Sequence, residues 1–148
     1  MKIRLMNLVM VIFVSFIIDG KVHAAELGGV KLNDTETVAG KTLVLNGIGL
    51  RTATVLKVKV YVMGMYLEAK SKDAEDIINS PQKKRIIQHY VRDIKREKLI
   101  GGWEDSFKSN NDNMAAIEKE FKTFLSYIAD VKKGEPYIFD FIDDRVEL

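Results

Sequence analysis

The feature that most constrains the fold is a long alternating segment at residues 55–67. Valines, a glycine and a tyrosine occupy every second position from residue 58 to residue 66, and the positions between them change from lysines to a tyrosine and methionines. Period-two alternation of β-branched and aromatic residues is typical of a β-strand. We therefore expect one long strand here, with a second face that is charged at first and covered only in its later half.

Shorter strands are predicted on both sides of this segment. Residues 27–32 and 42–45 read as two strands before it, and the turn-forming residues 46–49 are expected to end the second one. Residues 85–92 and 137–142 alternate in the same way and predict two strands after it. The sequence therefore contains enough strands for one sheet.

Helical periodicity marks three further segments. Ser71 is placed to cap a short helix ending at residue 79, and Asp93 is placed to cap a helix ending at residue 110. An apolar stripe over residues 113–131 predicts the third helix. Long strands joined by hairpins, with the helices clustered together, favour an α+β fold in which helices cover an antiparallel sheet.

The first 24 residues predict a secretory signal peptide. Lys2 and Arg4 precede an apolar run at residues 5–18, and small residues lead to an expected cleavage site after Ala24. The run is shorter than the roughly 20 residues that a membrane-spanning helix requires. We expect a single domain over residues 25–148, in the periplasm or secreted. The alternative is an uncleaved N-terminal anchor, which would then be the contact with a membrane.

Composition excludes several classes of site. The chain has no cysteine, so a disulfide, a thiolate zinc site and a cysteine nucleophile are ruled out. His89 is the single histidine after residue 24, in a predicted strand, and no metal-binding spacing accompanies it. The acidic residues after position 142 are most simply a solvated tail. The sequence therefore predicts no cofactor and no metal.

The charge balance argues against two classes of partner. Of the 23 basic and 21 acidic side chains, three basic and one acidic lie in the first 24 residues, so the remainder balance. A neutral domain has no electrostatic footprint for nucleic acid or for an anionic membrane. We therefore expect no nucleic-acid partner and no membrane contact by the domain itself.

Arg51 is the most informative polar residue. It follows the glycine-containing residues 46–50 and lies beside two predicted strands rich in apolar side chains. An arginine next to an apolar wall binds a carboxylate by a bidentate bond while the rest of the ligand is buried. The alternative is an ordinary surface arginine near a turn, because charged side chains are mostly exposed.

Several ordered segments carry a family resemblance. They are residues 46–51, 57–67, 92–93 and 131–134. Together they resemble the chalcone isomerase family, and more closely the exported bacterial chalcone isomerase-like proteins, over about residues 26–141. The resemblance implies an open-faced β-sandwich, a large antiparallel sheet covered by helices. Members of that family continue past this last predicted strand, so the C-terminal part of the family fold is expected to be missing.

The resemblance also implies roles for individual residues. Arg51 matches the arginine that stabilises the enolate in the enzymes, and Tyr61 stands where they have a threonine. In the fatty-acid-binding branch, an arginine and a tyrosine at these two places hold the ligand carboxylate. The enzymes' tyrosine and asparagine fall near Glu97 and Glu104, where two carboxylates would repel a phenolate. The resemblance therefore implies a non-catalytic binder of a fatty acid or a similar small amphipathic acid.

One geometric condition follows, and two other functions stay open. In one extended strand, Arg51 and Tyr61 would lie roughly 33 Å apart, so the chain has to reverse within residues 52–57. An intramolecular lyase of the chalcone isomerase type is the first alternative. A structural envelope protein that recruits another chain through exposed sheet surface is the second.

Overall fold

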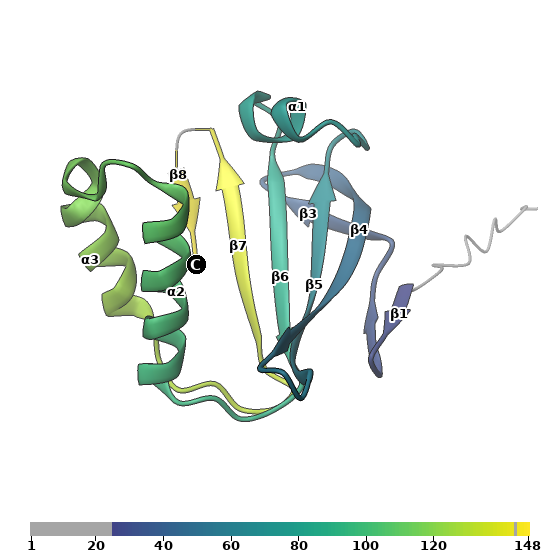
Figure 1. Cartoon of the computed structure of the whole chain (residues 1–148). Helices are drawn as coiled ribbons and strands as arrows, with labels where there is room; N and C mark the ends of the chain where they lie inside the picture. The colour runs from purple at the N-terminus through teal and green to yellow at the C-terminus, as the bar shows by residue number, and fades with distance from the viewer. Residues whose placement is uncertain (1–24, 144) are drawn as a thin grey trace, which may run out of the picture.

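The computed structural model describes residues 25–143 and 145–148, and the predicted signal peptide at residues 1–24 lies outside them (Figure 1). The elements are β1 (Ala25–Leu27), β2 (Val30–Leu32), β3 (Thr35–Val38), β4 (Lys41–Ala53), β5 (Val58–Leu67), α1 (Ala74–Asn79), β6 (Lys84–Tyr90), α2 (Arg96–Asn110), the 3₁₀ helix η1 (Met114–Ile117), α3 (Glu118–Tyr127), β7 (Pro136–Ile142) and β8 (Arg145–Glu147). Within the described ranges, no helix is long and apolar enough to cross a membrane.

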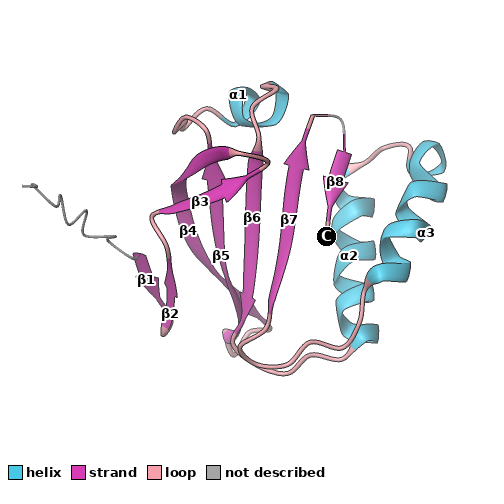
Figure 2. Ribbon diagram, turned by 180° about the vertical axis from the view of Figure 1, so that it is seen from behind, coloured by secondary structure: helices cyan, strands magenta, loops and turns pink. Residues whose placement is uncertain are grey.

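The main structural element is one curled antiparallel sheet. Its six strands run from β3 to β8 in sequence order, and each pairs with the next. Helices α2 and α3 lie beside the β7–β8 end, the β1–β2 hairpin lies at the opposite side, and α1 covers one end of the strands (Figures 1 and 2). The predicted α+β fold of an antiparallel sheet with helices is confirmed.

Strand β4 is much longer than predicted, because residues 46–49 do not form a turn. The register passes from Leu45 opposite Tyr66 to Gly47 opposite Met65, so Asn46 is one extra residue in the strand. Its side-chain Oδ1 accepts a hydrogen bond from the backbone N–H of Ser71, 3.0 Å away. Asn46 therefore forms a β-bulge, and the strand continues past it.

The predicted long strand starts three residues late, at the point where the chain reverses. Val55 and Leu56 belong to a turn between β4 and β5 and are 96% and 81% exposed. Thr54 and Lys57 flank them with φ of 63° and 50°, and the N–H of Lys57 donates to the carbonyl oxygen of Thr54 at 3.1 Å. The reversal required within residues 52–57 is confirmed.

The predicted helix starts were wrong by a few residues. Helix α1 is capped by Asp73, whose carboxylate accepts from two N–H groups of the first turn, and Ser71 instead accepts from the N–H of Asp73. Helix α2 begins at Arg96, and Asp93 accepts from the N–H of Lys133 at 2.9 Å. Asp93 therefore ties two loops together and caps no helix.

Three other predicted boundaries change. The helix predicted over residues 113–131 divides into η1 and α3 and ends at Tyr127, because the chain then extends to form a bridge between Val131 and Ile94. The strand predicted at residues 27–32 is a hairpin that turns at two glycines with positive φ. The predicted acidic tail contains the edge strand β8.

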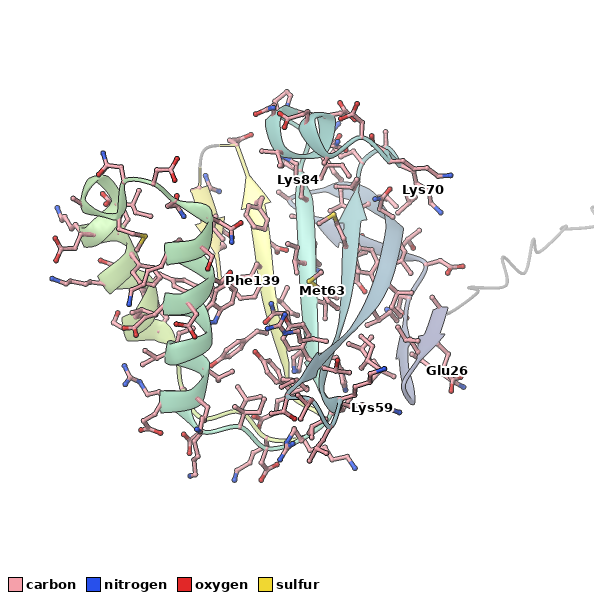
Figure 3. The ribbon with its side chains drawn as sticks, in the orientation of Figure 1. Glu26, Lys59, Met63, Lys70, Lys84 and Phe139 are labelled. Carbon is pink, nitrogen blue, oxygen red and sulfur yellow. The ribbon has the colours of Figure 1, made fainter. Side chains whose placement is uncertain are left out.

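The sheet packs differently on its two faces. The hairpin-side core is formed by buried residues that β1–β2 helps to cover: Val30, Leu32, Val38, Leu43, Leu45, Val62, Tyr66, Ile87 and Ile142. The helix-side core is formed by Tyr90, Leu99, Ile128 and Val131, with partly buried aromatic rings around them. Phe139 in β7 lies on the helix side of the sheet (Figure 3). Its ring is 5.8 Å from the ring of Trp103 in α2.

Candidate functional site

A cleft of about 650 Å³ opens at the end of the sheet opposite α1. It lies between the turn end of the β4–β5 hairpin, strand β6 and the first turns of α2. Its lining residues are Arg51, Ala53, Thr54, Val60, Tyr61, Gln88, Tyr90, Arg92, Asp93, Ile94, Lys95, Lys98, Leu99, Gly102, Trp103 and Ser106. Both residues that the sequence singled out as ligand-binding candidates are among them.

Arg51 and Tyr61 lie directly opposite each other on β4 and β5. Opposite residues of an antiparallel pair have Cβ atoms about 4.5–5.5 Å apart, so both side chains leave the same face of the sheet together. Arg51 is exposed and Tyr61 half-buried. Neither the Arg51 guanidinium nor the Tyr61 hydroxyl is hydrogen-bonded to any residue that the structure describes. Both polar groups are therefore available at the cleft.

A β-bulge next to this pair widens the wall of the cleft. The register passes from Arg51 opposite Tyr61 to Thr52 opposite Lys59, which leaves Val60 as the extra residue in β5. Val60 and Tyr61 are consecutive, yet both line the cleft. The carbonyl oxygen of Val60 accepts from the N–H of Val91 at 3.0 Å, which fixes the bulge against the chain beyond β6. Bulges commonly re-aim side chains in this way.

An aromatic wall supports Tyr61. The ring of Tyr90 packs edge-on against Tyr61 at 5.5 Å and against Tyr137 at 5.7 Å. The Tyr90 hydroxyl donates to Oε1 of Gln88 at 3.1 Å, and burial raises the pKa of Tyr90. Tyr90 therefore stays neutral and holds Gln88 in place. Sequence reasoning missed both residues, although the pairing of β5 with β6 puts Tyr90 opposite Tyr61.

Helix α2 supplies the apolar side of the cleft. Leu99 is buried, and Trp103 packs edge-on against Phe124 at 5.0 Å. The residues of α2 that line the cleft recur three or four positions apart, as one helix face requires: Lys98, Leu99, Gly102, Trp103 and Ser106. A ligand in the cleft therefore meets hydrocarbon and aromatic surface on this side.

The charge of the cleft is strongly positive. Its lining carries four cations, Arg51, Arg92, Lys95 and Lys98, and one carboxylate, Asp93. The backbone N–H of Lys133 and the ammonium of Lys132 lower the pKa of Asp93. Lys95 is paired with Asp130 at 2.7 Å. An anion is therefore the ligand type that this lining favours.

The family model of chalcone isomerase-like proteins matches residues 24–147. The chain belongs to the chalcone isomerase-like family. No curated protein matches its sequence. The family match in this chalcone isomerase-like chain runs from β1 to β8, so it includes every residue of the cleft and the Arg51–Tyr61 pair.

The carboxylates expected to repel a substrate do not line the cleft of this chalcone isomerase-like protein. Glu104 lines a smaller groove of about 380 Å³ between α2 and the η1–α3 segment, and Glu97 is exposed outside both hollows. The repulsion argument was therefore wrong, because these residues, seven positions apart, share a face of α2 that does not line the cleft. The helix positions that do face the cleft carry neither a tyrosine nor an asparagine.

Proposed function

We propose that this chalcone isomerase-like protein binds a fatty acid or a similar small amphipathic acid in the cleft, without catalysing a reaction. The observation that carries the proposal is the cross-strand pair Arg51–Tyr61 at the cleft, with a guanidinium and a hydroxyl that no described residue engages. The guanidinium offers a bidentate hydrogen bond to a carboxylate, and the phenol offers one more donor.

The rest of the cleft suits the hydrocarbon part of such a ligand. Val60, Leu99 and Trp103 present apolar surface, and burial of each methylene contributes about 0.8 kcal/mol. A volume of about 650 Å³ lies within the range of roughly 300–1,000 Å³ that small-molecule sites occupy. The surplus of cations adds long-range attraction for an acid.

A non-catalytic role is supported by the makeup of the cleft. The chalcone isomerase enzymes use a tyrosine and an asparagine that organise water and substrate, and α2 presents Leu99, Gly102 and Trp103 to the cleft. The proposal includes export, because residues 1–24 have the layout of a signal peptide, and it locates the protein in the periplasm or outside the cell.

A titration with a long-chain fatty acid tests the proposal. Trp103 is the single tryptophan of the chain and lines the cleft, so its fluorescence reports occupancy alongside calorimetry. We expect Arg51→Ala to weaken binding on the order of 10- to 100-fold, as the loss of a charge-assisted hydrogen bond does, and Tyr61→Phe to weaken it less. Lys59→Ala is the matched control, because Lys59 is an exposed cation of the same hairpin outside the cleft lining.

Two outcomes would change the assignment. Equal affinity of wild type and Arg51→Ala for the fatty acid would remove the proposed site. Turnover of a chalcone by the wild type, lost in Arg51→Ala, would instead assign an intramolecular lyase activity, since Arg51 also matches the arginine of the enzymes.

A further inference from the structure

The tip of the β4–β5 hairpin exposes two adjacent apolar side chains. Val55 and Leu56 are 96% and 81% exposed, more than any other large apolar residue that the structure describes. A lone exposed leucine needs no explanation, but two neighbours at the tip of a projecting hairpin form a point of apolar contact. The function proposed for the cleft does not use either side chain.

The backbone holds this tip in one shape. Ala53 pairs with Val58 at its base, and the N–H of Lys57 donates to the carbonyl oxygen of Thr54 at 3.1 Å. Thr54 and Lys57 both have positive φ, which is unfavourable for residues with a side chain and especially for the β-branched threonine. Strain of this kind persists where the surroundings impose it, and it is concentrated at functional segments.

Cations lie next to the tip and across the cleft from it. Lys57 and Lys59 are exposed next to it, and Arg51 lies on the same hairpin. Figure 3 shows Lys59 at the turn end of the hairpin, away from Lys70 and Lys84. Across the cleft lie three more cations, Arg92, Lys95 and Lys98.

The carboxylates at this end leave the cations in excess. Asp93 is engaged by Lys132 and by the N–H of Lys133, and Asp130 is engaged by Lys95 and by the N–H of Arg96. Glu97 lies exposed in the first turn of α2, and Glu135 accepts from the N–H of Lys132. These carboxylates are still fewer than the lysines and arginines of the hairpin and the cleft lining. The neutral net charge of the domain predicted no contact with an anionic membrane, but cations outnumber carboxylates locally at the turn end of the β4–β5 hairpin and around the cleft.

We propose that this tip docks the protein on an anionic phospholipid bilayer. Val55 and Leu56 enter the boundary between headgroups and acyl chains, and Lys57 and Lys59 meet the lipid phosphates, as in other interfacial anchors. A protein partner fits the tip less well, because stable interfaces bury about 800 Å² on each side, and two side chains on a turn supply far less.

Docking of this kind would bring the cleft to the lipid surface. Thr54 borders both the tip and the cleft, and Arg51, three residues earlier in the chain, also lines the cleft. The inference goes beyond the proposed function, since it names the surface on which the cleft would exchange its ligand. Its test does not require any ligand in the cleft.

A local fluorescent label tests the docking surface in the full-length chain. The sequence has no cysteine, so Leu56→Cys carries an environment-sensitive fluorophore at one defined site. Ile78→Cys is the matched control, because Ile78 is also an exposed apolar residue, 69% exposed, on α1 at the opposite end of the strands. We expect a blue shift and a several-fold rise in emission at position 56 with phosphatidylglycerol-containing vesicles, little change with pure phosphatidylcholine, and no change at position 78.

Unchanged emission of the label at position 56 on addition of anionic vesicles would overturn the proposal. Equal responses at positions 56 and 78 would also overturn it, because residues 1–24 or unspecific adsorption would then explain the binding. Reversing two charges with Lys57→Glu and Lys59→Glu should raise the vesicle concentration for half-maximal response by at least about tenfold. If the label at position 56 responds to vesicles but the protein does not bind a fatty acid, the docking proposal stands and only the function proposed for the cleft is rejected.

Discussion

The two faces of the sheet, built from the same strands, differ in how closely they are packed. On the hairpin side, Leu43, Val62 and Tyr66 are 0% exposed, and a Cβ added to Gly64 would lie 2.5 Å from the Cδ1 atom of Leu32. On the helix side, α2 and α3 cover only part of the sheet, and the cleft remains at one end. The comparison separates a face that stabilises the fold from a face with room for a ligand.

Two tyrosines of β5 show this separation. Tyr66 is buried on the hairpin side and donates its hydroxyl hydrogen to the carbonyl oxygen of Asn33 at 2.9 Å. Tyr61 is half-buried on the helix side, and its hydroxyl has no hydrogen-bond partner among the described residues. Because alternate residues of a strand point to opposite faces, one strand contributes both to stability and to the candidate site.

The largest effect is expected from truncating the buried tyrosine. Tyr66→Ala should lower the free energy of unfolding by about 3–5 kcal/mol, because it removes a buried ring and leaves a cavity. Tyr61→Ala should lower it by only about 1 kcal/mol, since Tyr61 is only partly buried. Urea denaturation followed by circular dichroism measures both. Equal losses for the two variants would contradict the separation of roles.

A second prediction concerns a charge cluster on the hairpin side. Arg85 donates two hydrogen bonds of 2.6 Å to Asp140 and one of 3.0 Å to Glu36, and these bonds raise its pKa. Arg85→Ala leaves two partly buried carboxylates facing each other and should destabilise the fold by about 2–3 kcal/mol, somewhat less than a fully buried pair would. Denaturation in urea measures this loss.

The exposed pair on α3 is the control for Arg85. Lys122 and Glu118 are 2.6 Å apart but 73% and 62% exposed, so Lys122→Ala should change stability by less than about 0.5 kcal/mol. A similar loss of unfolding free energy in Arg85→Ala and Lys122→Ala would show that burial does not determine how much these ion pairs stabilise the fold.

A third prediction is a fall in stability at alkaline pH. Burial, with a further contribution from Glu36, raises the pKa of Tyr66 to about 12, compared with about 10 for an unfolded tyrosine. The neutral phenol is therefore favoured in the folded state, and its contribution is complete below pH 10 and lost as the pH rises from about 10 to 12. Tyr66→Phe should reduce this fall and leave the part due to Tyr90, whose pKa burial also raises. The substitution should cost about 1 kcal/mol at neutral pH for the lost hydrogen bond.

Urea midpoints measured from pH 8 to pH 11.5 check the alkaline prediction. Tyr61→Phe serves as the comparison on the cleft face. It removes one smaller contribution to the raised pKa of Tyr90 and should keep most of the alkaline fall of the wild type. If the stability of Tyr66→Phe falls as much at alkaline pH as that of the wild type, groups other than Tyr66 cause the fall.

The fold could be predicted largely from strand periodicity, but boundaries depended on contacts between distant segments. The alternation after residue 58 predicted β5 and the opposite faces of Tyr61 and Val62 correctly. It wrongly placed Val60 on the same face as Val62, because Val60 is the extra residue of a bulge and lines the cleft. Asn46 failed as a turn signal because asparagine suits a bulge equally well, and only the partner strand distinguishes the two. Asp93 failed as a helix cap because its partner, the N–H of Lys133, is 40 residues away.

The candidate site could be predicted only in part. The resemblance pointed to Arg51 and Tyr61, but the residues of the turn between them contain no glycine, proline, asparagine or aspartate, so the reversal had to be assumed. The positive charge of the cleft was missed because its cations come from β4 and from the segment around Lys95, while net charge averages over the whole chain. Local sequence patterns predict single strands and helices, but the lining of a cleft depends on which distant elements pack together.

The smallest expected effect is a stabilisation, at the turn between β3 and β4. Val38 pairs with Lys41, so Ala39 and Gly40 form a two-residue loop, with φ of 44° and 75°. Positive φ at both positions is the requirement of a type I′ turn, for which asparagine followed by glycine is preferred. Ala39→Asn should therefore raise the free energy of unfolding by about 0.5 kcal/mol, because asparagine tolerates this conformation better than alanine. Ala39→Val, with a β-branched side chain, should lower it. Position 39 lies just before the start of β4 and Arg51 lies near its other end, so both variants should leave fatty-acid affinity unchanged. A change in affinity would show that the hairpin side and the cleft are coupled.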